Sequence, residues 1–192
     1  GFASTGANSF HLDFADNSSN AALGTDTSGN SNTWTVNNLN VSGISGTNSG
    51  NSWYFDGGNN TSITANDSDL ALGNGDWTVE MFVKPESGVN GQSALTSYNT
   101  NNPIFETDGP LKLRWFTAAT YNPGLGTGNW YHVAWVRHGS NGYIYLNGTR
   151  IANRSYSEGN LTQTSLAIGN RTSNGVPWKG LISNVHIVVG TA

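Results

Sequence analysis

The sequence predicts an all-β protein folded as a two-sheet antiparallel β-sandwich. Short runs of β-branched and aromatic residues recur along the 192-residue chain, and clusters of Gly, Asn, Ser and Pro separate them. No window of a dozen residues repeats apolar side chains at the spacing of an amphipathic helix. Short strands bounded by turn residues at this spacing are typical of sandwiches and barrels.

The expected strands follow one another along the chain, with one helical turn among them. The strands are Phe10–Phe14, Trp34–Val36, Trp53–Asp56, Thr61–Thr64, Trp77–Lys84, Ser93–Tyr98, Ile104–Glu106, Leu111–Thr117, Trp130–Arg137, Gly142–Leu146, Arg150–Asn153, Ser165–Ile168 and Leu181–Val189. The helical turn is expected at Asp67–Leu72, where Asn66 or Asp67 supplies an N-cap.

Two tight hairpins are also expected. The chain reverses through Gly139–Gly142 and again at Asn147-Gly148. Asn and Gly both tolerate the positive φ angles that a type I′ turn requires. These turns place three successive strands side by side.

Alternation along two of the strands indicates which side chains form the core. In Trp77–Lys84, the residues Trp77, Val79, Met81 and Val83 share one face, which we expect to be buried. Both faces of Trp130–Arg137 are largely apolar, so this strand is expected to be central in its sheet, with only Arg137 reaching water.

Composition excludes several classes of function. Charged residues make up 10% of the chain, the formal net charge is -4, and the 8 Lys and Arg residues are scattered, so no nucleic-acid partner is expected. No run of about 20 apolar residues is present, so no membrane insertion is expected. The absence of cysteine removes disulfides and thiolate metal sites. We expect one domain over residues 1–192, which begins with Gly1 and suits a mature product or a piece of a longer chain.

Three blocks of the sequence resemble a known family. The segments "SWYFDGGNNTSITANDSDLALGNGDWTVEMFVKP", "NWYHVAWVRHGSNGYIYLNGTRI" and "LAIGNRTSNGVPWKGLISNVHIVVG" resemble, in order, the blocks of the laminin-G-like jelly roll in the concanavalin A-like lectin/glucanase superfamily. The closing "GLISNVHIVVGTA" is similar to copies of this domain in virion fibre and tail proteins of bacterial viruses. The resemblance implies two sheets of six or seven strands with the first and last strands adjacent. It also implies binding of glycans or proteins without chemistry.

The resemblance implies a first candidate site on the open face of one sheet, where jelly rolls present rings and arginines to sugars. Arg114, Tyr143 and Tyr145 are the glycan-binding candidates there. By strand parity we expect them to share that face with Phe82, Phe116, Trp135 and Arg137. Such a surface combines apolar area with oriented polar groups. The alternative is that loops cover these rings.

A second candidate site lies in two rim loops, "SYNTNNP" and "GNRTSNGVP", which align with the ligand and calcium loops of the pentraxin branch. The acids of that branch are replaced here mainly by asparagines, so direct hydrogen bonding to glycan hydroxyls is expected in place of calcium. The candidates are Tyr98, Asn101, Asn102, Asn170, Arg171 and Asn174. The alternative is that these are ordinary solvated turn residues.

Calcium is considered for a third segment, "DTSGNSN". Asp26, Ser28 and Asn30 place oxygen-bearing side chains at every second position, and Asp16 or a main-chain carbonyl would complete the shell of a Ca²⁺ ion. The alternative is an Asx-turn loop without metal.

Catalysis is not expected. The carboxylate strand of the hydrolase branch is missing, and the nearest acid pair is Glu106 and Asp108, beside a predicted turn. His132 is expected to be a core or hydrogen-bonded histidine. Two hypotheses remain. The first is a non-catalytic module that binds a surface glycan or polysaccharide, displayed extracellularly or on a virion. The second is a structural spacer that contacts other virion or surface chains.

Overall fold

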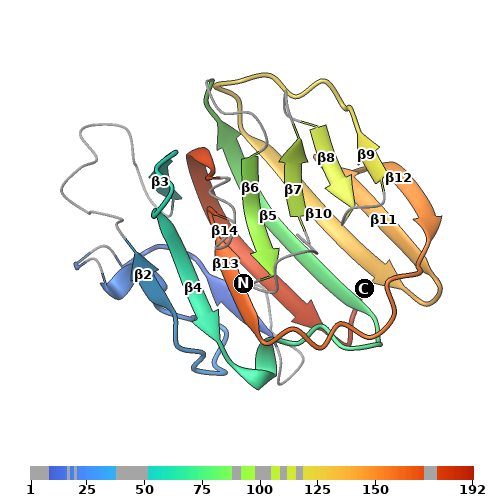
Figure 1. Ribbon diagram of the computed structural model, residues 1–192, viewed down its shortest axis with the longest axis horizontal. Coiled ribbons are helices and arrows are strands. Elements are labelled where there is room, and N and C mark those ends of the chain that lie inside the picture. The colour runs from blue at the N-terminus through green and yellow to red at the C-terminus, as the bar shows by residue number, and fades with distance from the viewer. Residues whose placement is uncertain are drawn as a thin grey trace.

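The computed structural model describes residues 9–16, 18–19, 21–37, 52–87, 92–97, 105–108, 112–115, 119–170 and 177–192. These residues form two antiparallel β-sheets packed face to face, as Figure 1 shows. The predicted all-β sandwich of the jelly-roll type is confirmed. Among the described residues, none lies in a helix long and apolar enough to cross a membrane.

The first sheet contains seven strands. Its order is β1 (Phe10–Leu12), β14 (Lys179–Val189), β5 (Trp77–Pro85), β10 (Tyr131–His138), β11 (Asn141–Leu146) and β12 (Thr149–Ser155), with β3 (Ser52–Asp56) also paired to β14. The first and last strands that the structure describes, β1 and β14, are neighbours, as the family resemblance implied. Strand β10 lies between β5 and β11, so its predicted central position is confirmed.

The second sheet also has seven strands and lies in front of the first in Figure 1. Its order is β2 (Thr35–Asn37), β4 (Ser62–Asn66), β13 (Ser165–Ile168), β6 (Gln92–Ser97), β7 (Phe105–Asp108), β8 (Lys112–Trp115) and β9 (Ala119–Tyr121). Two 3₁₀ turns, η1 (Ala21–Gly24) and η3 (Ser68–Leu70), complete the described elements. Strand β9 and η1 were not predicted.

The core fills the space between the two sheets. Trp77, Val79, Met81 and Val83 of β5 are all buried on the inner face, as predicted. From the opposite sheet, Trp115 stacks on Trp77 with a ring-centroid distance of 5.8 Å. Such aromatic pairs contribute about 0.5–1.5 kcal/mol beyond the area that they bury.

Both predicted hairpins are present. Asn147 and Gly148 have φ angles of 49° and 77°, the left-handed pair that a type I′ turn requires. The Asn147 side chain also accepts a 2.9 Å hydrogen bond from the main-chain N–H of His132. The turn therefore ties β11 to the start of β10 as well as reversing the chain.

The structure corrects one prediction about β10. Trp135 and Arg137 were expected on the open face, but they point into the sandwich, opposite Val79 and Trp77 of β5. Trp135 is 1% exposed. When both faces of a strand are apolar, alternation identifies two sets of side chains but does not say which set is inward.

Candidate functional site

The outer face of the first sheet, which points away from the core, carries a row of residues drawn from six strands. Each member is paired with the next across neighbouring strands. The row consists of His11, His186, Glu80, Ala134, Tyr145 and Arg150. Segments far apart in the sequence therefore place ionisable and aromatic side chains on one surface.

Further rings flank this row. Phe82 lies opposite His132, and their ring centroids are 4.9 Å apart. Tyr143 lies two residues before Tyr145 on the same face of β11. We call Phe82, His132, Tyr143, Tyr145 and Arg150 the outer platform.

The tyrosine side of the outer platform combines rings with a cation. The centroids of Tyr143 and Tyr145 are 6.4 Å apart, and both residues are half-buried. The Arg150 guanidinium lies 5.5 Å from the Tyr143 centroid, within the range of a cation–π contact worth about 0.5–1 kcal/mol at exposed sites. Arg150 is exposed, and so is Asn153 opposite Tyr143. This side offers ring faces together with hydrogen-bond donors.

On the side of the outer platform that contains Phe82 and His132, the Glu80 carboxylate fixes two histidine side chains. The Glu80 carboxylate lies 3.1 Å from Nε2 of His132 and 3.2 Å from Nδ1 of His186. The hydrogen bonds from these two histidines outweigh burial and lower the pKa of Glu80 from 4.5 to about 2. An ionised carboxylate only accepts hydrogen bonds, so His132 carries a hydrogen on Nε2 and His186 carries one on Nδ1. His132 is a hydrogen-bonded histidine, as predicted.

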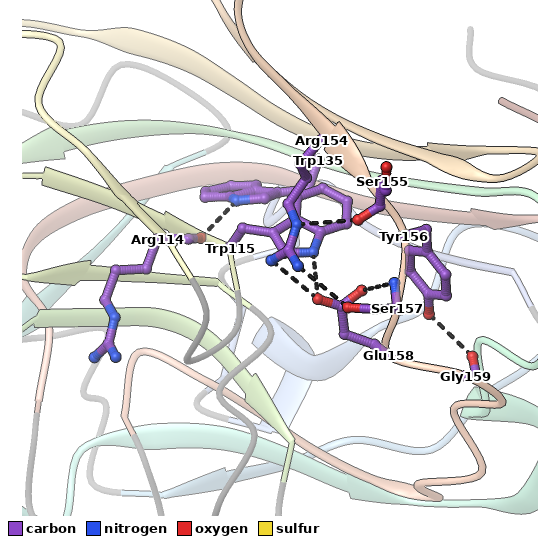
Figure 2. Close-up of polar contacts among 9 residues, drawn as sticks. All are labelled: Arg114, Trp115, Trp135, Arg154, Ser155, Tyr156, Ser157, Glu158 and Gly159. Atoms are coloured by element: carbon purple, nitrogen blue, oxygen red, sulfur yellow. Dashed lines mark hydrogen bonds and ion pairs between the residues drawn. The ribbon is translucent and has the colours of Figure 1, made fainter.

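Arg114 does not belong to this surface. It lies on β8 in the second sheet, and its main-chain carbonyl accepts a 2.9 Å hydrogen bond from Nε1 of Trp135. Figure 2 shows the Arg114 side chain directed away from the indole that its backbone holds. The prediction that Arg114 shares a face with Tyr143 and Tyr145 is therefore wrong, because parity within single strands does not assign strands to sheets.

Sequence reasoning missed a polar cluster that follows β12. Oε1 of Glu158 accepts a 3.0 Å hydrogen bond from Nε1 of Trp115 and lies 3.1 Å from Nη1 of Arg154 (Figure 2). Arg137 lies 4.0 Å from the ring centroid of Tyr156. The cluster fastens the segment after β12 to the second sheet. The i, i+4 spacing of Arg154 and Glu158 predicts a contact only on a helix, and this segment is not helical, so no signal in the sequence indicated the cluster.

The rim-loop site is mostly beyond the part of the chain that the structure describes. Tyr98, Asn101, Asn102, Arg171 and Asn174 all lie outside the described residues. Asn170 is 3% exposed, and its side-chain amide donates a hydrogen bond to the main-chain carbonyl of Asn59. Asn170 therefore has a structural contact that fastens two loops together.

The Asp26 loop is organised by hydrogen bonds to its carboxylate. Oδ1 of Asp26 accepts from the main-chain N–H groups of His11 and Ser28, and Oδ2 accepts from the main-chain and side-chain N–H groups of Asn32. Burial alone would raise the pKa of Asp26, but these hydrogen bonds outweigh it and lower the pKa. A cation would have to compete with these donors for the carboxylate oxygens.

The other calcium candidates have partners of their own. Ser28 and Asn30 donate hydrogen bonds to the main-chain carbonyl of Ser9, and Oδ1 of Asp16 accepts from Ser18. Within the described residues, no group of three or more His, Cys, Asp or Glu side chains is arranged to hold a metal ion. The contacts are those of an Asx-turn loop, and calcium binding stays a prediction.

Solved structures share this fold at low sequence identity. Domain 4 of AbnA, an extracellular arabinanase from Geobacillus stearothermophilus in complex with arabinotriose, has a TM-score of 0.69 and 21% identity, covering 94% of this chain and 91% of that chain. A mutant of Trypanosoma rangeli sialidase that displays trans-sialidase activity has a TM-score of 0.68 and 15% identity, covering 98% and 32%. The binding domain of Paraclostridial Mosquitocidal Protein 1 has a TM-score of 0.64 and 14% identity, covering 88% and 46%. The chain thus spans less than half of the last two.

Comparison with curated proteins gives no match. The sequence profile described as the concanavalin A-like lectin/glucanases superfamily, of the laminin-G type, matches residues 56–190. The matched region runs from the end of β3 through β14 and includes the whole outer platform. Because the match covers well over half of the sequence, the chain belongs to the concanavalin A-like lectin/glucanase superfamily and carries a laminin-G-like domain.

Proposed function

We propose that this domain is a non-catalytic glycan-binding module and that the outer platform is its binding surface. The observation that carries the proposal is the pair of half-buried rings of Tyr143 and Tyr145, with the Arg150 guanidinium beside them. A sugar ring stacks its C–H face on an aromatic ring while charged and amide groups bind its hydroxyls. Binding sites commonly combine apolar area with a few oriented polar groups in this way.

One feature supports glycan binding, and a second argues against catalysis at the outer platform. The family is a lectin-like fold, and among the solved structures that share it are a domain in complex with arabinotriose and a sialidase in complex with sialic acid. The acid beside the outer platform, Glu80, is bonded to two histidines and has a pKa of about 2. Such an acid is ionised near neutral pH and cannot serve as the general acid that glycoside hydrolysis requires.

We place the domain outside the cell, on a virion or a cell surface, where it would bind a surface glycan or polysaccharide. Its partners there would include other virion or surface protein chains. A single exposed platform makes few contacts, and repetition of the domain along a fibre or capsid would raise its avidity. Residues 1–192 would form a single domain of this kind.

The alternative function is a structural spacer without glycan binding. Burial of Trp135 and the contact of Arg137 with Tyr156 favour it, because two side chains expected to meet sugars are used inside the sandwich. The two proposals differ in what they require of Tyr143 and Tyr145. A binder needs their ring faces, and a spacer does not.

A glycan array on the isolated domain, run with calcium and with EDTA, tests the proposal. We expect the wild type to bind and the double variant Tyr143→Ala/Tyr145→Ala to lose binding while its melting temperature stays close to that of the wild type. Thr35→Ala, an exposed position on β2 of the other sheet, is the matched control and should bind normally. Equal binding by the wild type and the double variant would exclude the outer platform.

A further inference from the structure

We infer that the ligand is an extended glycan chain lying across strands β5 to β12, and not a single terminal sugar. This inference rests on the proposed function and concerns the kind of glycan bound. Three features support it. The aromatic rings of Phe82 and Tyr145 lie on strands that are not neighbours, the residue between them is a small alanine, and His132 offers a polar group that is already held in place.

The side chains at the two sides of the outer platform lie on strands that are not neighbours. Phe82 is on β5, Tyr145 is on β11 and Arg150 is on β12, with β10 between β5 and β11. Hydrogen-bonded strands lie about 4.8 Å apart, so Phe82 is at least ~10 Å from Tyr145 and ~14 Å from Arg150 across the sheet. A single sugar ring is about as wide as an aromatic side chain. It can contact one side of the outer platform but not both.

Ala134 occupies the position between the two sides. In the row it lies between Glu80 and Tyr145, and it is the smallest side chain there. It is 5% exposed, and its paired neighbours Glu80 and Tyr145 both have longer side chains. By contrast, Phe82 at one side is 38% exposed. The centre of the outer platform is therefore low, and no long side chain from this position blocks a chain that crosses from one side to the other.

A hydrogen-bonding group on β10, between the two sides of the outer platform, is already positioned. Nδ1 of His132 is the ring nitrogen that does not contact Glu80, and in the neutral ring it is an acceptor for a sugar hydroxyl. Its side chain is 26% exposed, and Phe82 packs beside its ring. A residue fixed in this way loses little side-chain entropy when a ligand binds. Rings at both sides and a fixed acceptor between them are suited to several sugar residues in succession.

Oligosaccharide ladders from monosaccharide to hexasaccharide test the inference. They would be prepared from mannan, xylan, glucan, arabinan and galactan, and from any other glycan that the array identifies. For the ladder that binds, we expect Kd to fall as the chain lengthens to about three sugar residues, the number that spans the ~14 Å from β5 to β12, and then to level off.

Two single variants locate the two sides. We expect Phe82→Ala and Tyr145→Ala each to raise the Kd of the hexasaccharide roughly tenfold, as loss of an anchoring ring does at other interfaces. Phe82→Tyr retains a ring and should bind like the wild type, and Thr35→Ala on β2 should also be unchanged. Melting temperatures measured on the same samples identify any variant that has lost its fold.

The outcomes separate the inference from the proposed function. If the monosaccharide binds as tightly as the hexasaccharide and Tyr145→Ala still weakens it, the glycan-binding function holds and the extended-chain inference is overturned. If Phe82→Ala leaves hexasaccharide binding unchanged, the inference is also overturned. If the folded wild type binds no glycan on the array, both are overturned.

Discussion

Nε1 of Trp135 donates a 2.9 Å hydrogen bond to the main-chain carbonyl of Arg114, and this contact joins β10 of the first sheet to β8 of the second. A buried indole N–H needs an acceptor, and a carbonyl of the opposite sheet supplies one. Trp135 is paired with Ile144 of β11, so the alternate residues Tyr143 and Tyr145 lie on the outer face of the sheet.

Trp135→Ala is expected to lower the free energy of unfolding by about 3–5 kcal/mol, because it opens a large cavity and leaves the Arg114 carbonyl without its donor. Tyr143→Ala removes a half-buried ring at the surface and should cost much less. Urea denaturation of both variants measures the difference. Equal losses of stability would mean that Tyr143 is a core residue and not part of a binding surface.

Acid should destabilise the protein through Glu80. Its pKa is lowered from 4.5 to about 2, so its contribution to stability is complete above the unfolded-state value and is lost as the pH falls towards 2. A shift of this size corresponds to ~3 kcal/mol as an upper figure, since the carboxylate is still 19% exposed. The unfolding free energies of the wild type and of Glu80→Gln, measured over this pH range, should converge as the acid is protonated. Parallel curves would contradict the shift.

His11 should act in the same direction as Glu80, but at higher pH. Burial, and then the charge of His186, lower the pKa of His11 below 6.5. The folded protein therefore favours neutral His11, and this contribution is lost as the pH falls from 6.5 through the lowered pKa. Thermal melts at about pH 7.5 and about pH 5.5 should show a larger acid-induced drop for the wild type than for His11→Gln. The same drop in both proteins would show that His11 does not titrate differently on folding.

Asp26→Ala should destabilise the protein, because four N–H donors lose their acceptor. We expect a cost of about 1–3 kcal/mol, the usual range for buried donors left unsatisfied. Asp16→Ala is a suitable control, since among the described residues the hydrogen bonds that its carboxylate accepts come from Ser18 at the surface.

Calcium binding at the same loop makes a separate prediction. If Asp26 holds an ion, EDTA lowers the melting temperature of the wild type and has no effect on Asp26→Ala, because a ligand that binds the folded state stabilises it by mass action. Identical wild-type melts with calcium and with EDTA would exclude the ion and leave the loop as a hydrogen-bonded Asx turn.

Local sequence patterns accounted for most of the strands. Alternation identified the inner face of β5 from Trp77 to Val83, and Asn147-Gly148 identified the hairpin between β11 and β12. Both signals act over a few residues, since they depend on the period-2 geometry of a strand and on the φ angles of a turn.

The sequence alone determined that this chain is a β-sandwich with a laminin-G-like order of strands, and that Tyr143 and Tyr145 share a face. Only the tertiary structure decided that this face is the outer one, that Arg114 lies on the other sheet, and that Glu80 meets His186 across 106 residues of chain. The physical reason is that side-chain alternation is fixed locally by the backbone. The strand that lies alongside, and the face that is covered, are set by packing between distant segments.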